Sequence, residues 1–258
     1  MAFDPALIAA LHPHVLAAEE LSGSEPALSA FQTSTIDALL HGQYEGDMTI
    51  ATLLRHGDLG IGTIDHLDGE LIVADGEAWV ARSDGTLRRV SDDERTPFAV
   101  VTPFDTQVKR TVPTPVDHEE LIALIDHRYA GDATGARAVR IDGELDVHAR
   151  SVPRQEPPYR PLAEVVEGQQ VFELTKVAGT LVGFRFPAVA SGLEVPGYHL
   201  HAITADRTRG GHVLRARVRS GTVRIGQLTD LHMELPPGVE LPTGPDDDGA
   251  LDAVEHQG

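Results

Sequence analysis

A two-residue alternation of hydrophobic and polar side chains runs through most of the chain after residue 60. Successive side chains of a β-strand point to opposite faces, so this period predicts strands with one buried face. Turns containing Asp-Gly separate the segments up to residue 91 and indicate a meander of antiparallel hairpins. The strands expected in the first half are 31–35, 60–65, 70–75, 77–84, 86–91, 98–104 and 106–112.

The second half of the chain predicts three more hairpins. The first covers residues 136–153 and turns at Asp142-Gly143, and the next covers 171–187 and turns at Ala178-Gly179. The third turns within the polar segment from Thr204 to Gly211. The other strands expected here are 212–219, 222–228 and 231–236.

Helical periodicity is limited to a few segments. The clearest helix covers residues 117–129, where apolar residues gather on one face and Asp117 and Glu120 have the spacing of a capping box. Asp47 is a plausible N-cap for the later of two short helices. These two helices are expected at residues 36–42 and 48–57.

The balance of many short strands and few helices predicts an α+β fold. We expect mainly antiparallel and mixed β-sheets in two subdomains. The expected parts are an N-terminal arm (1–30), a mixed β subdomain with helices (31–132) and a C-terminal β subdomain with an acidic tail (133–258). Their boundary is placed near residues 131–135.

Composition narrows the possible partners. The formal net charge of −19 disfavours nucleic acid and anionic membrane surfaces as partners. The absence of cysteine excludes disulfides, thiolate metal sites and a cysteine nucleophile, so a metal would need histidine and carboxylate ligands. The first twenty residues hold no Lys or Arg and no segment has the length of a membrane span, so we expect a soluble cytoplasmic protein.

Three of the thirteen histidines lie close together in the third hairpin. His199 and His201 are two residues apart and therefore share one face of a strand. A turn centred between Asp206 and Arg207 places His201 directly opposite His212 and brings all three imidazoles within reach of one metal ion. A β-bulge at the glycines would break this parity.

The face that carries these histidines is the apolar one. On the outgoing strand, His199 and His201 share their face with Ile203, and on the return strand the arginines point the other way. The residues expected on the face of His212 are Leu214, Ala216 and Val218. Buried imidazoles are costly unless their lone pairs are occupied, which favours a metal over core histidines bonded to backbone carbonyls. No dinucleotide, phosphate-loop, GxSxG or HExxH motif is present.

Several long segments make the chain resemble the α-acetolactate decarboxylase family between about residues 31 and 233. They include STIDALLHGQYEGDMTIATLLRHGDLGIGT, LDGELIVADGE, AVRIDGELDVHARSVPRQEPPYRPL and PGYHLHAITADRTRGGHVL. The resemblance implies conversion of (S)-2-acetolactate to (R)-acetoin and CO2, with zinc stabilising an enediolate that is then protonated on one face. It also implies a homodimer.

The resemblance further implies roles for individual residues. His199, His201 and His212 match the zinc ligands, and Arg150 and Glu70 match catalytic residues that would orient the carboxylate and handle protons. Without the resemblance, the local sequence around Arg150 and Glu70 predicts that both are ordinary surface residues. The remaining implied residues are Thr63, near the substrate, and Glu255, as a second glutamate from the tail. Which of Glu70 and Glu255 donates the proton, and which of them also ligates the metal, stays open at this point.

Two other classes of protein fit the histidine pattern. One is a different three-histidine metal enzyme, such as a dioxygenase or a hydrolase, and iron in the purified protein would favour the dioxygenase. The other is a non-catalytic metal-binding or sugar-binding β module. Bound zinc without release of CO2 from acetolactate would favour that module.

Overall fold

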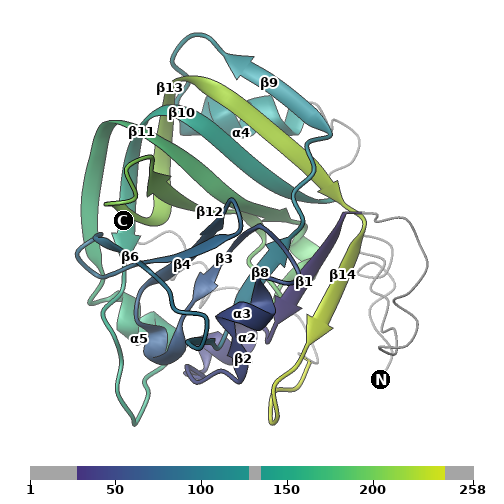
Figure 1. The fold of residues 1–258 in the computed structure, drawn as a ribbon, viewed down its shortest axis with the longest axis vertical. Coiled ribbons are helices and arrows are strands. Elements are labelled where there is room, and N and C mark those ends of the chain that lie inside the picture. The colour runs from purple at the N-terminus through teal and green to yellow at the C-terminus, as the bar shows by residue number, and fades with distance from the viewer. Residues whose placement is uncertain (1–27, 128–134, 242–258) are drawn as a thin grey trace.

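The computed structural model describes residues 28–127 and 135–241 and consists mainly of β-strands (Figure 1). Most strands belong to two sheets, and the helices are short. The expected α+β class, with mixed and antiparallel sheets and few helices, is confirmed. In chain order the described elements are β1 (Ser29–Thr33), α2 (Ile36–Leu40), β2 (Met48–Thr49), α3 (Ile50–Leu53), β3 (Leu59–Thr63), the 3-10 helix η1 (Asp65–Leu67), β4 (Glu70–Ala74), β5 (Glu77–Ala81), β6 (Leu87–Arg89), β7 (Arg95–Thr96), β8 (Ala99–Thr102), β9 (Val108–Val112), α4 (His118–His127), β10 (Ala136–Ser151), α5 (Leu162–Val166), β11 (Gln170–Phe186), the 3-10 helix η2 (Ala188–Ala190), β12 (Gly197–Thr204), β13 (Gly210–Leu228) and β14 (Asp230–Glu234).

The first sheet has seven strands in the order β14-β1-β8-β3-β4-β5-β6. Strands β3, β4 and β5 follow one another as the expected meander, and β1 pairs in parallel with β14 at one edge. Strand β14 comes late in the chain and still belongs to this sheet, so the two ends of the described chain meet there. All five residues of β3 and of β4 are buried because both faces of the sheet are covered.

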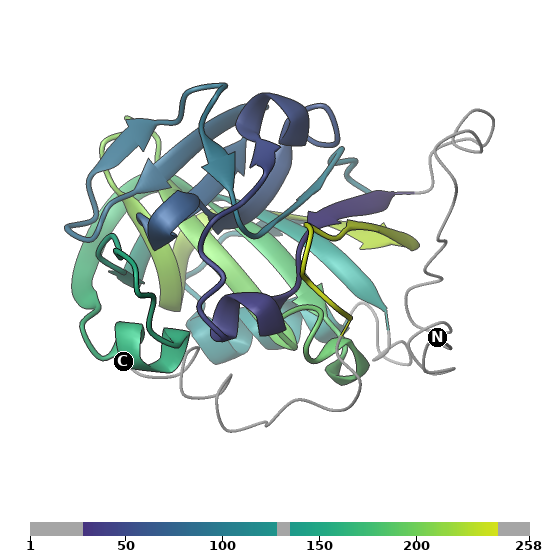
Figure 2. The ribbon, with the colours of Figure 1, turned by 90° about the horizontal axis from the view of Figure 1, so that it is seen from below.

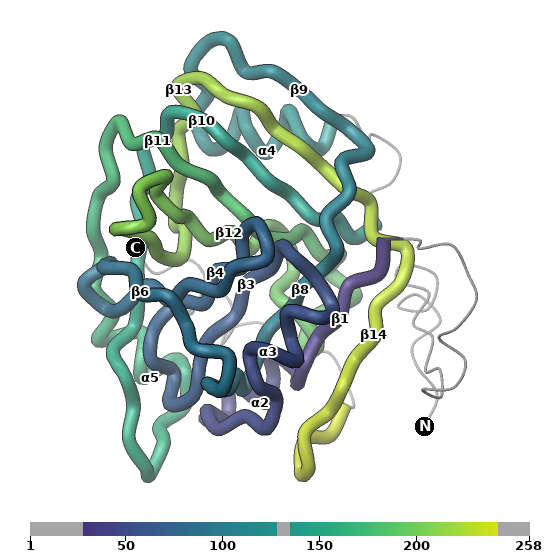
Figure 3. Tube along the Cα trace, viewed as in Figure 1, coloured from purple at the N-terminus to yellow at the C-terminus, as the bar shows by residue number. Residues whose placement is uncertain are grey.

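The second sheet closes on itself. Its order is β10-β11-β12-β13-β9, and β13 also pairs with β10, so that four strands form a ring. Figure 3 shows β10, β11 and β13 as long continuous tubes across the upper half of the molecule. Helix α4 packs against β13, and Leu121 and Ile125 of α4 are buried in the core of this sheet.

Two of the predicted hairpin turns are wrong. Asp142-Gly143 lies inside the 16-residue strand β10, and Ala178-Gly179 lies inside the 17-residue strand β11. Gly143 is opposite Gly179 on one side and Gly221 on the other, so three backbones meet without side chains. A Cβ atom on Gly143 would lie 2.1 Å from the Ser220 carbonyl oxygen. These glycines permit close approach of strands where the sheet bends, rather than a reversal of the chain.

The predicted strands 212–219 and 222–228 are likewise one strand, β13. The capping box of α4 is confirmed, because the Asp117 and Glu120 carboxylates accept from each other's backbone N–H at 2.9 and 3.0 Å. Asp47 does not cap α3. Thr49 does, and its hydroxyl accepts from the N–H of Thr52, because the strand β2 continues to this residue before the helix begins.

The two sheets pack face to face and share one hydrophobic core. It joins Ile61 and Ile72 of the first sheet to Val182, Phe184 and Ile203 of the second. Helices α2 and α5 lie near each other at one end of the molecule (Figure 2), and a smaller apolar cluster connects them. Among the described residues, no helix has the length and hydrophobicity needed to cross a membrane.

The predicted division into subdomains stays a prediction. Most of its proposed boundary lies at residues 131–134, outside the described part of the chain, as do most of the N-terminal arm and most of the acidic tail.

Candidate metal centre and its pocket

The histidine hairpin has the predicted register. Strands β12 and β13 pair so that His201 is directly opposite His212, and His199 lies two residues before His201 on the same face. The chain reverses at residues 205–208, and the glycines Gly210 and Gly211 continue the ladder without a bulge. The regular alternation of faces therefore holds over the part of the hairpin that carries the imidazoles.

The alternation of side chains between the two faces of β13 is interrupted just beyond His212. The register between β10 and β13 shifts between His148 and Ala149, which leaves Leu214 as an extra residue. The expectation that Leu214 shares a face with Ala216 and Val218 is therefore wrong, since Val213 joins those two residues in the core instead. The bulge lets His212 face the first sheet while the rest of β13 packs into its own sheet.

The three imidazoles form a compact buried cluster. One nitrogen of each ring lies within 4.8 Å of a nitrogen of the other two, and the ring centroids are 5.0 to 5.5 Å apart. Such spacing suits three ligands on one face of a tetrahedral ion and leaves a position open.

Hydrogen bonding tests whether these residues fit a metal. The Nδ1 atom of His201 lies 2.8 Å from the carbonyl oxygen of Leu71 and donates to it, which places the lone pair on Nε2. That Nε2 and the Nδ1 of His199 are buried and make no hydrogen bond. A hydrogen bond to a carbonyl oxygen accounts for Nδ1 of His201 but not for these two nitrogens. The donor set fits a metal that accepts the remaining lone pairs.

Electrostatics keep His199 and His201 neutral. Burial, with a smaller contribution from Arg150, lowers the pKa of His199 to about 3. Burial and the neighbouring His199 hold the pKa of His201 well below its usual value. Neutral imidazole is the form that binds a metal, so the site needs little or no proton release from these two rings at neutral pH.

Arg150 and Glu70 come from different sheets and meet beside the histidines. Arg150, near the end of β10, pairs in register with His212, and Glu70 is the first residue of β4. The Glu70 carboxylate lies between two partners, with Oε1 3.4 Å from Nη1 of Arg150 and Oε2 3.5 Å from Nε2 of His201. Both side chains are buried. The packing of the two sheets thus creates a buried charged pair at the edge of the histidine cluster.

Thr63 is opposite Glu70 in the β3–β4 pair and lines the same pocket. Its hydroxyl donates to the carbonyl oxygen of Gly69 at 2.8 Å and so ties the ends of the connecting turn together. Contact between Thr63 and a substrate stays a prediction. Glu255 lies outside the described residues.

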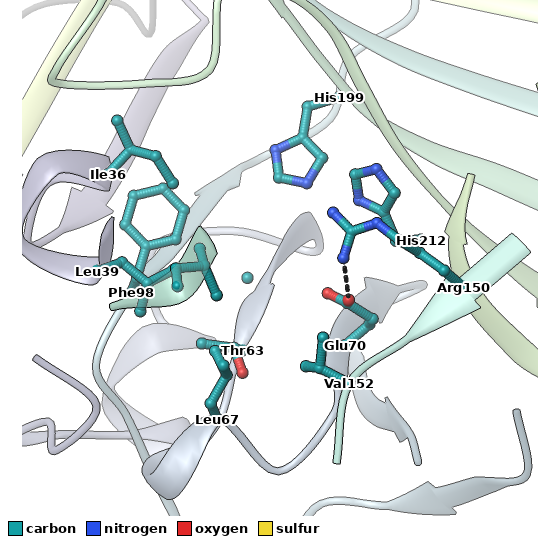
Figure 4. Close-up of a pocket in the computed structure, with 12 residues that line it drawn as sticks. Ile36, Leu39, Thr63, Leu67, Glu70, Phe98, Arg150, Val152, His199 and His212 are labelled. Carbon is teal, nitrogen blue, oxygen red and sulfur yellow. Dashed lines mark hydrogen bonds and ion pairs between the residues drawn. The ribbon is translucent and has the colours of Figure 1, made fainter. Parts of the chain in front are cut away.

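The pocket in front of these residues has two unlike sides (Figure 4). His199, His212, Arg150 and Glu70 make the polar side. Ile36, Leu39, Leu67 and Phe98 make the apolar side, whereas Val152 lies beside Glu70. Leu162 also lines the pocket. The sequence pattern predicted only that apolar residues of this kind are buried, and gave no indication of a pocket. A small ligand with a charged end and alkyl groups matches this arrangement.

The chain is similar to known proteins of one family. Residues 30–241 match the family model of alpha-acetolactate decarboxylase. The chain is 43% identical over 240 residues to the alpha-acetolactate decarboxylase of Raoultella terrigena, covering 91% of this chain and 92% of that relative. It is 43% identical to the Klebsiella aerogenes protein of the same name, covering 83% of each. The crystal structure of the Bacillus subtilis strain 168 alpha-acetolactate decarboxylase superposes with a TM-score of 0.84 at 36% identity, covering 89% of this chain and all of that one.

Proposed function

The chain belongs to the alpha-acetolactate decarboxylase family, and we propose that it converts (S)-2-acetolactate to (R)-acetoin and CO2 with zinc as its metal. The observation that carries the proposal is the joining of a buried three-histidine cluster to the Arg150–Glu70 pair in one pocket. Family membership supports the decarboxylase activity. The identity of the metal and the stereochemical course are our proposals.

His199, His201 and His212 are the proposed zinc ligands. A zinc ion held there supplies a Lewis acid that stabilises negative charge developing on the oxygen of the substrate ketone. The hydrogen bond from His201 to Leu71 orients that ring toward the cluster. The buried surroundings strengthen every charge interaction in the pocket because little water screens it.

Arg150 orients the substrate carboxylate. The bond between this carboxylate and C2 breaks, CO2 departs, and the electron pair moves toward the neighbouring ketone to give an enediolate. A planar guanidinium can hold a carboxylate through two parallel hydrogen bonds and so align the breaking bond with the ketone π system. Before substrate binds, Glu70 offsets the positive charge of Arg150.

Glu70 is the proposed proton donor: its carboxylate, paired with Arg150 before substrate binds, takes up one proton from solvent when the substrate carboxylate replaces it on Arg150, and passes this proton to C2 after CO2 has left. Protonation of the planar enediolate at C2 from one side yields a single enantiomer of acetoin. Glu70 lies on the polar side of the pocket, whereas the described residues on the opposite side are apolar and include no acid. Glu255 is the alternative donor, and Glu70→Gln distinguishes the two. The variant should give acetoin of lower enantiomeric excess if Glu70 is the donor, and acetoin of unchanged enantiomeric excess if Glu255 is.

The test is an assay of acetoin and CO2 formation from 2-acetolactate, with and without a chelator, together with the metal content of the purified protein. We expect one zinc per chain, release of both products, and loss of activity on chelation. Bound metal without CO2 release would instead point to a metal-binding module. Iron in place of zinc, also without CO2 release, would favour a dioxygenase.

Two further proposals are a cytoplasmic location, which the composition of the chain supports, and a homodimer, which the family resemblance supports. Sedimentation equilibrium of the purified protein tests the dimer, and a mass of one chain at micromolar concentration would exclude it under those conditions.

A further inference from the structure

The turn between β3 and β4 has an unusual backbone. His66 (φ 65°, ψ 18°) and Leu67 (φ 53°) are consecutive non-glycine residues in the left-handed region. L-residues avoid this region because Cβ approaches the carbonyl oxygen, so such positions persist only when their surroundings hold them. Strained positions of this kind cluster at functional sites. Contacts with other segments of the chain must therefore hold the turn.

Three hydrogen-bonding groups of His66 bind two other segments of the chain. Its N–H donates to the carbonyl oxygen of Tyr44 at 2.7 Å, and its carbonyl oxygen accepts from the N–H of Gln155 at 2.7 Å. Its Nδ1 lies 2.5 Å from the hydroxyl of Tyr159, which in turn donates to the Glu45 carboxylate at 2.9 Å. Because that hydroxyl proton points to Glu45, Nδ1–H of His66 is the donor to the Tyr159 oxygen. We call these five residues the His66 bracket.

The bracket holds the turn from outside, and the pocket lies on its inner side. Leu67, which follows His66, reaches into the pocket, and Glu70 stands at the end of the turn (Figure 4). The hydroxyl of Thr63 closes the turn by donating to Gly69, the residue before Glu70. A shift of the turn therefore moves Leu67 and Glu70 relative to His201 on the opposite sheet.

We propose that His66 and Tyr159 are a positioning pair that fixes the turn carrying Leu67 and Glu70 against the histidine cluster, and thereby governs turnover and the enantiomeric purity of the product. The proposal rests on the proposed decarboxylase function. Neither residue lines the pocket, so both act through the turn. Misplacing a reacting group by a fraction of an ångström slows a reaction without removing any group that takes part in it.

Two substitutions distinguish a positioning role of the bracket's hydrogen bonds from a role in packing alone. Tyr159→Phe removes the hydroxyl and keeps the ring, which packs on the apolar cluster near the pocket. His66→Asn removes the imidazole, and asparagine tolerates the left-handed backbone better than most residues. Glu156→Gln is the matched control, because Glu156 belongs to the same segment but its side chain is exposed and pairs with Arg154.

We expect zinc-loaded, folded Tyr159→Phe and His66→Asn to lose about 3- to 10-fold in kcat, the range of one hydrogen bond, and to give acetoin of lower enantiomeric excess. The double variant should lose no more than the worse single variant, because both changes break one contact. Amide hydrogen exchange in a peptide spanning residues 64–70 should be about 3- to 10-fold faster in both, and unchanged in Glu156→Gln.

The outcomes are separable. Wild-type kcat, enantiomeric excess and exchange in both single variants would overturn the inference. So would losses that merely follow the unfolded or zinc-free fraction, since these mark a general structural role. If the wild-type protein released no CO2 from acetolactate, the proposed function would fall, and the exchange measurement would still decide whether the bracket holds the turn.

Discussion

Replacement of Arg150 by methionine separates two tasks that the proposed mechanism gives this residue. The guanidinium is buried and ion-paired with Glu70 at 3.4 Å, and it faces the pocket. Methionine fills much of the same space without a charge or a hydrogen-bond donor. The change therefore removes the carboxylate clamp and also leaves Glu70 without its cationic partner.

Each of these losses has a magnitude. A hydrogen bond to a charged group contributes about 1.5–3 kcal/mol, so loss of the clamp should lower kcat/KM about 10- to 150-fold. Breaking a buried ion pair by removing one partner costs about 3–5 kcal/mol, which corresponds to a fall in Tm on the order of 10 °C. The second loss should be larger in metal-free protein, because a zinc ion beside Glu70 supplies positive charge in place of the guanidinium.

The assay measures acetoin formation, zinc per chain and Tm with and without metal for Arg150→Met. Arg150→Lys is the comparison variant, because it keeps the charge and loses the planar fork, and we expect activity between the other two proteins. Wild-type turnover in fully zinc-loaded Arg150→Met would refute the assignment of the clamp to this residue. An equal fall in Tm with and without zinc would refute the electrostatic link between Glu70 and the metal.

Three further predictions concern the metal, pH and the sheet. His201→Ala should lose both zinc and activity, whereas His148→Ala, at a partly exposed histidine paired with Glu173, should keep both by metal analysis and the acetoin assay. In metal-free protein, His199 has a folded pKa of about 3, below the unfolded value of about 6.5. Below pH 6.5 the unfolded chain takes up a proton that folded His199 does not, so the free energy of unfolding falls by about 1.4 kcal/mol per pH unit down to pH 3, and the effect of His199 is constant above pH 6.5. Denaturant titrations with the same midpoint at pH 7 and pH 5 would contradict this. Gly143→Val should lower the free energy of unfolding by about 3 kcal/mol or more, because its Cβ would lie 2.1 Å from the Ser220 carbonyl oxygen, while Gly168→Ala, whose Cβ has only ordinary contacts, should stay close to wild type in the same titration.

The histidine hairpin could be predicted because its geometry is local. Alternation along a strand places His199 and His201 on one face, and the length of the turn sets His201 opposite His212. The capped helix α4 was predictable for the same reason, since its capping box spans four residues. The failed turns at Asp142-Gly143 and Ala178-Gly179 had the same local signal as real turns. Only the neighbouring strands distinguish them, because Gly143 lies between Gly179 and Gly221.

The sequence by itself determined the strand-rich class, the three-histidine cluster and, through resemblance, the reaction proposed for it. Tertiary structure decided the rest of the pocket. Glu70 and Arg150 are 80 residues apart and look like surface residues in their own segments, yet the packing of the two sheets buries them together. The hydrogen bond from His201 to the Leu71 carbonyl uses a backbone atom that every residue possesses, so it could not be predicted from residue types. Periodicity reports which side of a strand is buried, whereas the contacts across that buried side depend on how two sheets are placed against each other.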